Sequence, residues 1–154
     1  MNPASISLRR ARAPQSAAAT ISDFDRIMAA VFALTGQKPA MDERRQAYRV
    51  RIDSTLELNL FPDPKGNLVM IGNCAPLVAQ IGAEHLLRVM QLNSYFPSAH
   101  QVTVGFIHSN RTMQVWSRYP MHRMKDREVV RMLKLMANAV SHVNAILAES
   151  DHRT

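Results

Sequence analysis

Cysteine is nearly absent from the sequence, because Cys74 is the only one among 154 residues. A single thiol cannot form an intrachain disulfide, and it cannot build the cysteine clusters that hold structural metals. The neighbouring Asn73, Ala75 and Pro76 predict a loop at this point. A catalytic thiol would need a histidine base that only tertiary contact could supply, so we expect a small packed side chain. A reducing compartment, the cytoplasm, suits this composition.

Long apolar runs are missing as well. No run approaches the roughly 18 residues that a membrane helix needs, and residues 1–22 lack the apolar stretch of a signal peptide. The sequence therefore predicts neither stable membrane insertion nor conventional secretion. Residues 1–19 carry little apolar content and are expected to form a disordered basic tail. Their composition also resembles a transit peptide, but Pro3 and Pro14 oppose the helix that such a peptide forms.

The rest of the chain has the size and apolar content of one domain. With 47% hydrophobic residues it can bury a core, and we expect a single domain over residues 20–150 followed by a short tail, 151–154.

Motifs that carry chemistry are also absent from the sequence. No two of the six histidines form the helical i, i+4 pair of a metalloprotease, and the glycines fit no phosphate-binding loop. There is no Gly-x-Ser-x-Gly elbow, and the 12 acidic residues form no pattern suggesting a paired acid and base. The sequence therefore predicts a binding protein and not an enzyme, with no cofactor and no metal site.

Basic residues are in excess, with 19 Lys and Arg against 12 Asp and Glu and a formal charge of +7. They fall into three groups, in the tail, around Asp42 and Glu43, and from Arg118 to Lys134. This spread leaves one alternative open, a basic nucleic-acid-binding regulator, because Trp116 and Tyr119 flank Arg118 and could stack on bases. Aromatic residues make up only 6% of the chain, which disfavours nucleic acid as a partner.

Three segments have the apolar spacing of helices. The first is capped by Thr20 or Ser22 and ends at Gly36, with Asp23 and Asp25 in its first turn. The second covers residues 83–94, and the third, the longest, starts at Asp126.

Five segments alternate with the period of strands, over residues 48–53, 56–61, 68–71, 101–107 and 113–119. Tight turns inside each group make the pairing antiparallel. The fold class is therefore α+β, with an antiparallel five-stranded sheet in α-β-β-β-α-β-β-α order. The helices can cover one face, so the other face and the second helix need cover that a dimer would supply.

Methionine is abundant, with ten residues. Its flexible thioether suits surfaces that bind varied partners, although it also fills cores. We expect Met132 and Met136 to be core residues, whereas Met121 and Met124 are candidates for a binding surface. The strand edges offer a second binding mode, in which an extended peptide adds to the sheet. The alternative, that the chain's own helices cover every edge, stays open.

The order of elements from Thr20 to Glu149 resembles the class I chaperones of bacterial type III secretion, the Tir-chaperone-like family. The segments that carry the resemblance are Asp23–Met28, Tyr48–Ile52, Leu56–Leu60 and Leu86–Asn93. The stretch from Ala13 to Gly36 is similar to the broad-specificity export-control chaperones of plant-pathogenic bacteria. The chain departs from the family in charge, because members are usually acidic and its pI is near 10.3.

The resemblance implies a cytoplasmic bacterial homodimer that serves virulence. It would bind type III effector proteins, keep their N-terminal regions competent for export, and present them to the secretion ATPase and export apparatus. The implied effector-binding residues are Phe24, Ile27, Met28 and Val31 on the first helix and Leu56, Leu58, Leu60 and Phe61 on the second strand. The implied dimer interface comprises Leu86, Val89, Met90 and Asn93 on the second helix with Val104, Phe106 and Trp116 on the hairpin.

Overall fold

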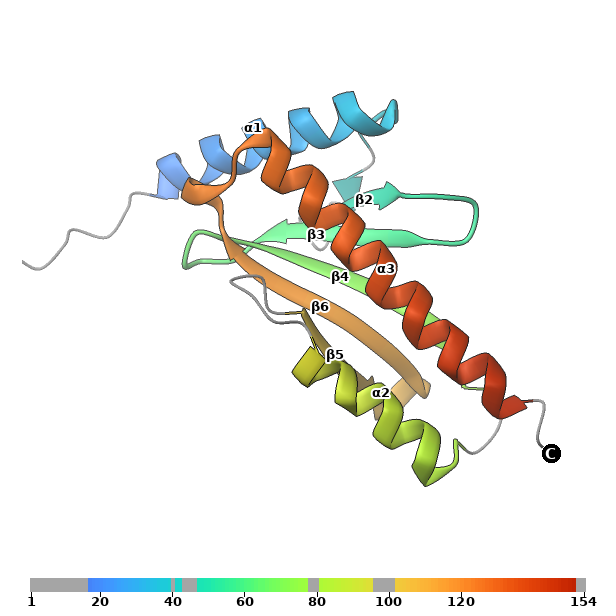
Figure 1. The fold of residues 1–154 in the computed structure, drawn as a ribbon. Helices are drawn as coiled ribbons and strands as arrows, with labels where there is room; N and C mark the ends of the chain where they lie inside the picture. Colours follow the sequence, from blue (N-terminus) through green and yellow to red (C-terminus); the bar gives the residue numbers. More distant parts are fainter. Residues whose placement is uncertain (1–16, 40, 43–46, 78–80, 96–101, 152–154) are drawn as a thin grey trace, which may run out of the picture.

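The computed structural model describes residues 17–39, 41–42, 47–77, 81–95 and 102–151. Figure 1 shows the arrangement of its helices and strands. In chain order the elements are α1 (Ala17–Thr35), β1 (Met41–Asp42), β2 (Ala47–Arg51), β3 (Glu57–Pro62), β4 (Asn67–Pro76), α2 (Ala83–Tyr95), β5 (Val102–Ile107), η1 (His108–Asn110), β6 (Thr112–Pro120), η2 (Met121–Arg123) and α3 (Asp126–Asp151).

The strands form one antiparallel sheet in the order β1-β2-β3-β4-β6-β5. The predicted α+β fold and the five predicted strands, β2 to β6, are confirmed. The two-residue β1 adds a sixth strand beside β2, where Met41 pairs with Tyr48. So short a strand has no alternating pattern, and the sequence could not reveal it.

The three helices pack against one face of this sheet. Figure 1 shows α3 running diagonally across the strands, with α1 toward the β2 end and α2 toward the β5 end. Buried side chains from α1, α3 and β2 to β6 form one continuous core between these layers. Along α3 they recur at steps of three and four, as at Val129, Met132, Met136 and Val140, which is the pattern that predicted the helix.

The structure confirms the predicted end of α1 and contradicts its predicted start. The end was predicted correctly: Gly36 adopts a positive φ of 65° and donates its N–H to the carbonyl oxygen of Phe32 at 2.9 Å. The start was wrong, because the helix begins at Ala17 and Asp23 and Asp25 lie beyond its first turn. Alanine is the strongest helix former, so Ala17 to Ala19 extend the helix upstream of the expected cap.

The helices extend into both segments that were predicted to be tails. Residues 17–19 are helical, and α3 continues through Asp151. The remainder of the expected tails, residues 1–16 and 152–154, lies outside the described residues.

Strand β4 is longer than predicted and contains Cys74, which was expected in a loop. The strand runs to Pro76 because β6 continues to pair with it, from Asn67 opposite Pro120 to Pro76 opposite Thr112. A shift of register after Asn73 accommodates the extra residues as a bulge. Cys74 is buried there, so the prediction of a packed side chain is confirmed.

Methionine serves the core of this chain. Among the methionines whose burial the structure describes, seven are buried, including Met132 and Met136 as expected. Met121 and Met124 are buried too, so their assignment to a binding surface was wrong. They pack under α1, where Arg26 donates a hydrogen bond to the Met124 carbonyl oxygen at 2.9 Å.

Candidate functional site

The residues predicted to bind effectors are mostly core residues. All four on α1 (Phe24, Ile27, Met28 and Val31) and three on β3 (Leu56, Leu58 and Leu60, with Leu56 just before the strand) are buried in the chain's own core. In this conformation they serve the chain's own core, because a regular apolar pattern marks the face that packs against the neighbouring layer. Only Phe61, on the face of β3 away from the helices, is half-exposed.

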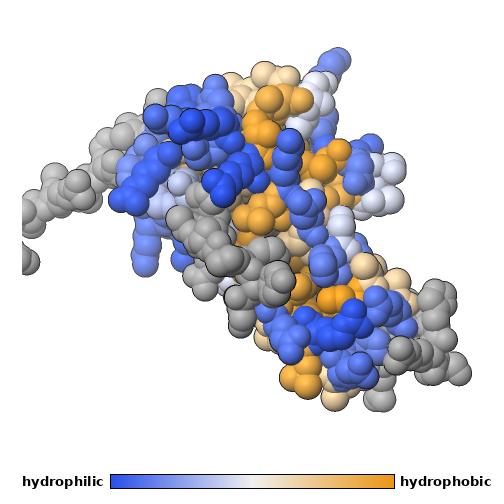
Figure 2. Space-filling model, in the orientation of Figure 1, coloured by the Kyte–Doolittle hydropathy of each residue, from blue (hydrophilic) through white to orange (hydrophobic). Residues whose placement is uncertain are grey.

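The residues predicted for the dimer interface divide into two groups. Val89 and Val104 are buried inside the chain, whereas Leu86, Met90, Phe106 and Trp116 are large apolar side chains that remain exposed. Leu87 on α2 is exposed by 63% and was not predicted. We call Leu86, Leu87 and Met90 the α2 surface. In Figure 2 apolar side chains are visible at the lower end of the molecule, where α2 lies.

Asn93 has a role inside the chain. Its Oδ1 accepts the N–H of Val104 at 2.6 Å, and its Nδ2 donates to the carbonyl oxygen of Val104 at 3.1 Å. Val104 lies on β5, which ends the sheet, so the side-chain amide takes the place of a neighbouring strand at that residue. Asn93 therefore closes part of the β5 edge.

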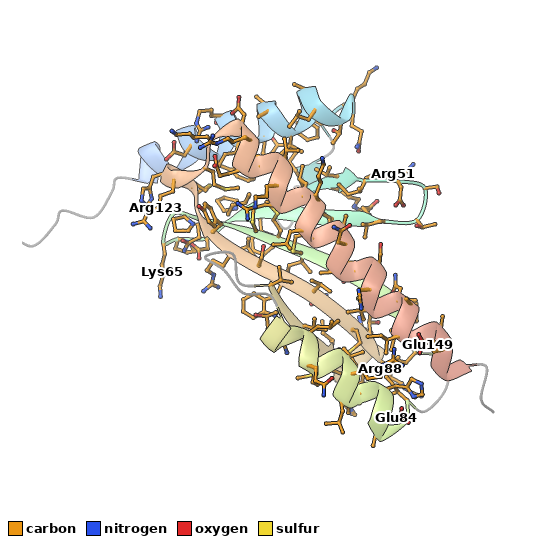
Figure 3. The ribbon with its side chains drawn as sticks, in the orientation of Figure 1. Arg51, Lys65, Glu84, Arg88, Arg123 and Glu149 are labelled. Carbon is orange, nitrogen blue, oxygen red and sulfur yellow. The ribbon has the colours of Figure 1, made fainter. Side chains whose placement is uncertain are left out.

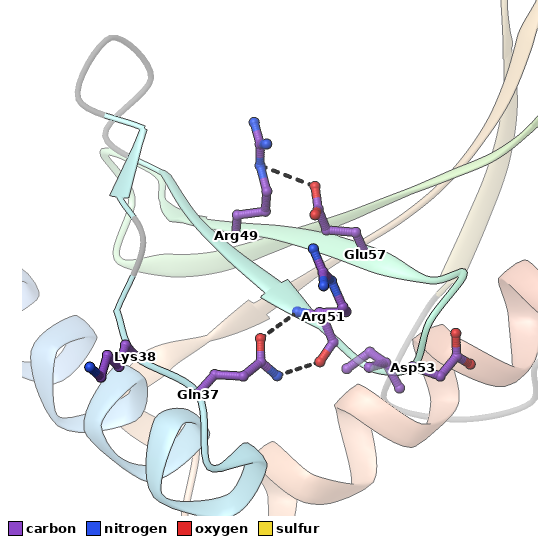
Figure 4. A pocket seen from close by; sticks show the side chains of 7 residues that line it. Gln37, Lys38, Arg49, Arg51, Asp53 and Glu57 are labelled. Carbon is purple, nitrogen blue, oxygen red and sulfur yellow. Dashed lines mark hydrogen bonds and ion pairs between the residues drawn. The ribbon is translucent and has the colours of Figure 1, made fainter.

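The other end of the sheet is closed in the same way. Beyond the short β1, the backbone N–H of Arg51 on β2 donates to Oε1 of Gln37 at 2.8 Å, and Nε2 of Gln37 donates to the Arg51 carbonyl oxygen. Figure 4 shows both bonds, with Arg49 and Glu57 forming an ion pair beside them. The chain's own side chains thus cover both edges in part, which favours the alternative left open by the sequence.

A groove lies where α1 and α3 diverge. It has a volume of about 470 Å³. Its apolar lining comprises Leu34 from α1, Ile52 after β2, and Val130, Leu133 and Ala137 from α3. Polar and basic side chains complete it, namely Thr35, Gln37, Arg51, Lys134 and Asn138. We call this the α1–α3 groove.

A second hollow, of about 380 Å³, adjoins the groove and shares Gln37, Arg51 and Ile52 with it. Its two carboxylates are already engaged. Glu57 Oε1 lies 3.0 Å from Arg49 Nε, and Asp53 accepts the backbone N–H groups of Thr55 and Leu56. The bonds from Thr55 and then Leu56 lower the pKa of Asp53. These carboxylates are therefore committed to the local structure of the β2–β3 turn.

Sequence reasoning missed the groove, although it had recognised some of its parts. Leu34 and Leu133 belong to the predicted helical patterns, but nothing in those patterns marks where two helices separate. Gln37 and Arg51 are 14 residues apart and carry no motif. Only the tertiary arrangement brings them together.

The Cys74 thiol is not activated as a nucleophile. Burial raises the pKa of the Cys74 thiol to about 12, which keeps it protonated near neutral pH. In the part of the chain that the structure describes, no three His, Cys, Asp or Glu side chains gather as metal ligands do. Over the same residues no helix is both long and apolar enough to cross a membrane.

The proposed stacking platform for nucleic acid is divided between the two faces of β6. Ser117 and Val115 face the core, so Trp116 and Arg118 point away from it, whereas Tyr119 packs against the core. Arg118 also pairs with Asp63, with Nε 3.2 Å from Oδ2. Trp116 and Tyr119 therefore do not present one continuous aromatic surface.

Known structures match the fold of this chain, whereas no sequence comparison gives a match. No model of a protein family matches the chain, and no curated protein sequence does. A chain in the structure of the HopA1–SchA chaperone–effector complex matches with a TM-score of 0.68 at 13% identity, over 85% of this chain and 99% of that one. A chain in the ExsC–ExsE complex matches with a TM-score of 0.67 at 11% identity, over 82% and 94%.

A third match is the structure of the Yersinia pestis type III secretion chaperone SycH in complex with a stable fragment of YscM2. Its TM-score is 0.60 at 17% identity, over 77% of this chain and 98% of that one. The chain therefore has the fold of the matched chains in these three complexes.

Proposed function

We propose that this chain is a cytoplasmic type III secretion chaperone. It binds effector proteins as a homodimer, keeps their N-terminal regions competent for export, and delivers them to the secretion ATPase and export apparatus. The observation that carries the proposal is the similarity in fold to the HopA1–SchA complex, which extends over 99% of the matched chain. By the resemblance of its N-terminal part, it serves several effectors.

The α2 surface supports the homodimer. Leu86, Leu87 and Met90 present apolar area on one helix, although Arg88 between them pairs with Glu149 of α3. Exposed apolar groups gathered on one element favour association. Phe106 on β5, a strand that α2 contacts, is also a large apolar side chain that remains exposed.

The dimer is tested by the mass in solution. Light scattering at micromolar concentration is expected to give twice the chain mass of 17.3 kDa. Leu86→Asp or Met90→Asp should give the single-chain mass, because an unpaired charge buried in an interface costs several kcal/mol. A wild-type monomer would contradict the homodimer, and an unchanged mass in both variants would contradict this interface.

The secretion role is tested in the host bacterium. Proteins that copurify with the chain are identified by mass spectrometry, and their type III export is measured in a strain lacking the chain. We expect export to fall while transcription of the exported proteins is unchanged, with recovery on complementation. Unchanged export of every copurifying protein would contradict the chaperone function.

A further inference from the structure

We propose that one end of the molecule binds the anionic headgroups of a phospholipid bilayer through charge. The turn between β3 and β4 meets η2 at this end, where the backbone N–H of Met121 donates to the carbonyl oxygen of Gly66 at 3.0 Å. Three cations lie beside this contact, and we call them the basic end: Lys65 in the turn, Arg123 on η2 and Lys125 before α3. The inference goes beyond the proposed function, which concerns contacts with proteins only.

The cations of the basic end are exposed and available to a ligand. None of the three has a carboxylate within ion-pair distance in the described part of the chain. Figure 3 shows Lys65 and Arg123 at the same end of the ribbon, with both side chains pointing outward. Figure 2 shows this end as hydrophilic surface. The positive charges therefore stand where a second surface can reach them.

The carboxylates around the basic end do not cancel its charge. Four of them lie within 4.0 Å of an arginine that is not part of the basic end, in the pairs Asp63–Arg118, Glu128–Arg127, Asp23–Arg26 and Asp126–Arg26. Asp25 on the neighbouring α1 is exposed and forms no ion pair among the described residues. Three unpaired cations therefore face one unpaired carboxylate, which leaves this end positive.

The basic end offers charge without apolar contact. The large apolar side chains that remain exposed in the described residues lie on α2, β5, β6 and near the end of α1. The methionines of this end, Met121 and Met124, are buried. Protein partners are held mainly by aromatic and apolar anchors that become buried in the interface. Lipid headgroups need no such anchor, because an anionic surface attracts exposed lysine and arginine directly.

Nucleic acid also presents phosphate groups, but the basic end lacks the elements that hold it. Its cations stand on a turn, on the three-residue η2 and on the residue before α3, and neither the turn nor η2 is long enough to lie along a groove of a duplex. Single strands are bound by stacking on aromatic side chains. Tyr119, which lies just before η2, packs against the core instead. A lipid surface is therefore the source of phosphate that suits this end.

The experiment measures cosedimentation of the full chain with vesicles of phosphatidylcholine in which about a quarter of the lipid is anionic phosphatidylglycerol. Vesicles of phosphatidylcholine alone are the neutral comparison. We expect the chain to sediment with the anionic vesicles at low salt, to be released as salt is raised, and to stay in solution with the neutral ones. A chain that does not sediment with anionic vesicles at low salt would overturn the inference.

A triple variant locates the contact on the basic end. Lys65→Gln with Arg123→Gln and Lys125→Gln should weaken binding to anionic vesicles about a hundredfold, because each cation near such a surface contributes a factor of about five. All three side chains are exposed, so the variant is expected to keep the circular dichroism spectrum and the solution mass of the wild type.

The matched control removes the same charge elsewhere. Lys38, Arg51 and Lys134 are also exposed and form no ion pair among the described residues. Figure 3 shows Arg51 on the other side of the molecule from the basic end. Their replacement by glutamine should leave vesicle binding at least about ten times tighter than in the basic-end variant. Equal weakening by the two triple variants would mean that net charge alone attracts the chain, and would overturn the inference.

A labelled DNA duplex of about 20 base pairs tests the other source of phosphate. Duplex binding that is tighter than vesicle binding and is lost in the basic-end variant would overturn the inference in favour of nucleic acid. The mass and export measurements test the chaperone function without lipid vesicles. A failure of that function and a failure of this inference are therefore distinguishable.

Discussion

At the scale of single residues, Gly72 sets how closely α3 approaches the sheet. It lies on β4 between Leu58 of β3 and Val115 of β6. A Cβ at this position would lie 2.5 Å from Val140 Cγ2 and 3.0 Å from Leu58 Cδ2. Neither branched side chain can move away freely inside a packed core. The absence of a side chain here is therefore a condition for the packing of the two layers.

We expect Gly72→Ala to lower the free energy of unfolding by about 1–3 kcal/mol, the usual range for overpacking a core. Chemical denaturation measures the change. Gly105→Ala is the matched control, because it also lies in a strand and its added methyl group would meet no atom within 4 Å. Equal stability of the two variants would show that α3 does not lie this close to β4.

The thiol of Cys74 gives a second prediction at this scale. Burial raises its pKa to about 12, whereas an unfolded cysteine titrates near about 8.5. Since only the thiolate reacts, a disulfide reagent at pH 8 should modify the native chain far more slowly than the chain in denaturant. Between these two pKa values the unfolded state binds fewer protons, so stability should fall as pH rises.

Cys74→Ala should remove that part of the pH dependence, as thermal unfolding at a series of pH values would show. Rapid modification of the native thiol would contradict its burial. Because Cys74 is the only cysteine, the reagent reports on one position without interference.

The sequence predicts which residues are apolar and periodic, but not which surface they meet. Phe24, Leu58 and Leu60 were assigned to effectors and are core residues. Leu86 and Met90 were assigned to an interface and are exposed. Both sets obey the same periodicity, and only the packing of the other layers distinguishes them.

At the scale of elements, side-chain amides hold β5 at one end of the sheet and, beyond the short β1, the end of β2 at the other. Asn93 binds Val104 on β5, and Gln37 binds Arg51 on β2. The first pair is partly buried and the second is exposed to solvent. Water can replace Gln37 more readily than Asn93, because an exposed backbone group finds other partners.

We expect Asn93→Ala to cost about 1–2 kcal/mol of stability and to speed hydrogen exchange of the Val104 amide. Gln37→Ala, the comparison at the other edge, should cost less and leave Val104 exchange unchanged. Nuclear magnetic resonance of the exchanging amides separates the two effects. Unaltered Val104 exchange in Asn93→Ala would show that the amide does not hold this strand.

Elements with a long periodic pattern could be predicted from the sequence. Elements whose length depends on hydrogen bonding to a distant strand could not. The core of α3 follows from its repeats, and β2 and β3 follow from strict alternation. The extension of β4 past Gly72 to Pro76 depends on β6, which is about 40 residues later in the chain. The two-residue β1 depends on β2 in the same way.

At the scale of the whole molecule, the α2 surface predicts that stability depends on concentration. If two copies bury these side chains, the dimer unfolds at a temperature that rises with protein concentration. We expect this rise for the wild type and its absence for Leu86→Asp. Leu34→Asp, an equal change at the α1–α3 groove, should keep the rise. Calorimetry over a hundredfold range of protein concentration would measure the unfolding temperature. A wild-type unfolding temperature that does not change with concentration would exclude a dimer whose dissociation is coupled to unfolding.

The partial closure of both sheet edges has a consequence for how copies of the chain can meet. Strands with bare backbone groups can template the growth of fibres from identical molecules. The carboxamides of Asn93 and Gln37 occupy such groups at each end without adding a strand that could itself be extended. At these two residues the backbone is therefore not free to pair with a strand of a second copy.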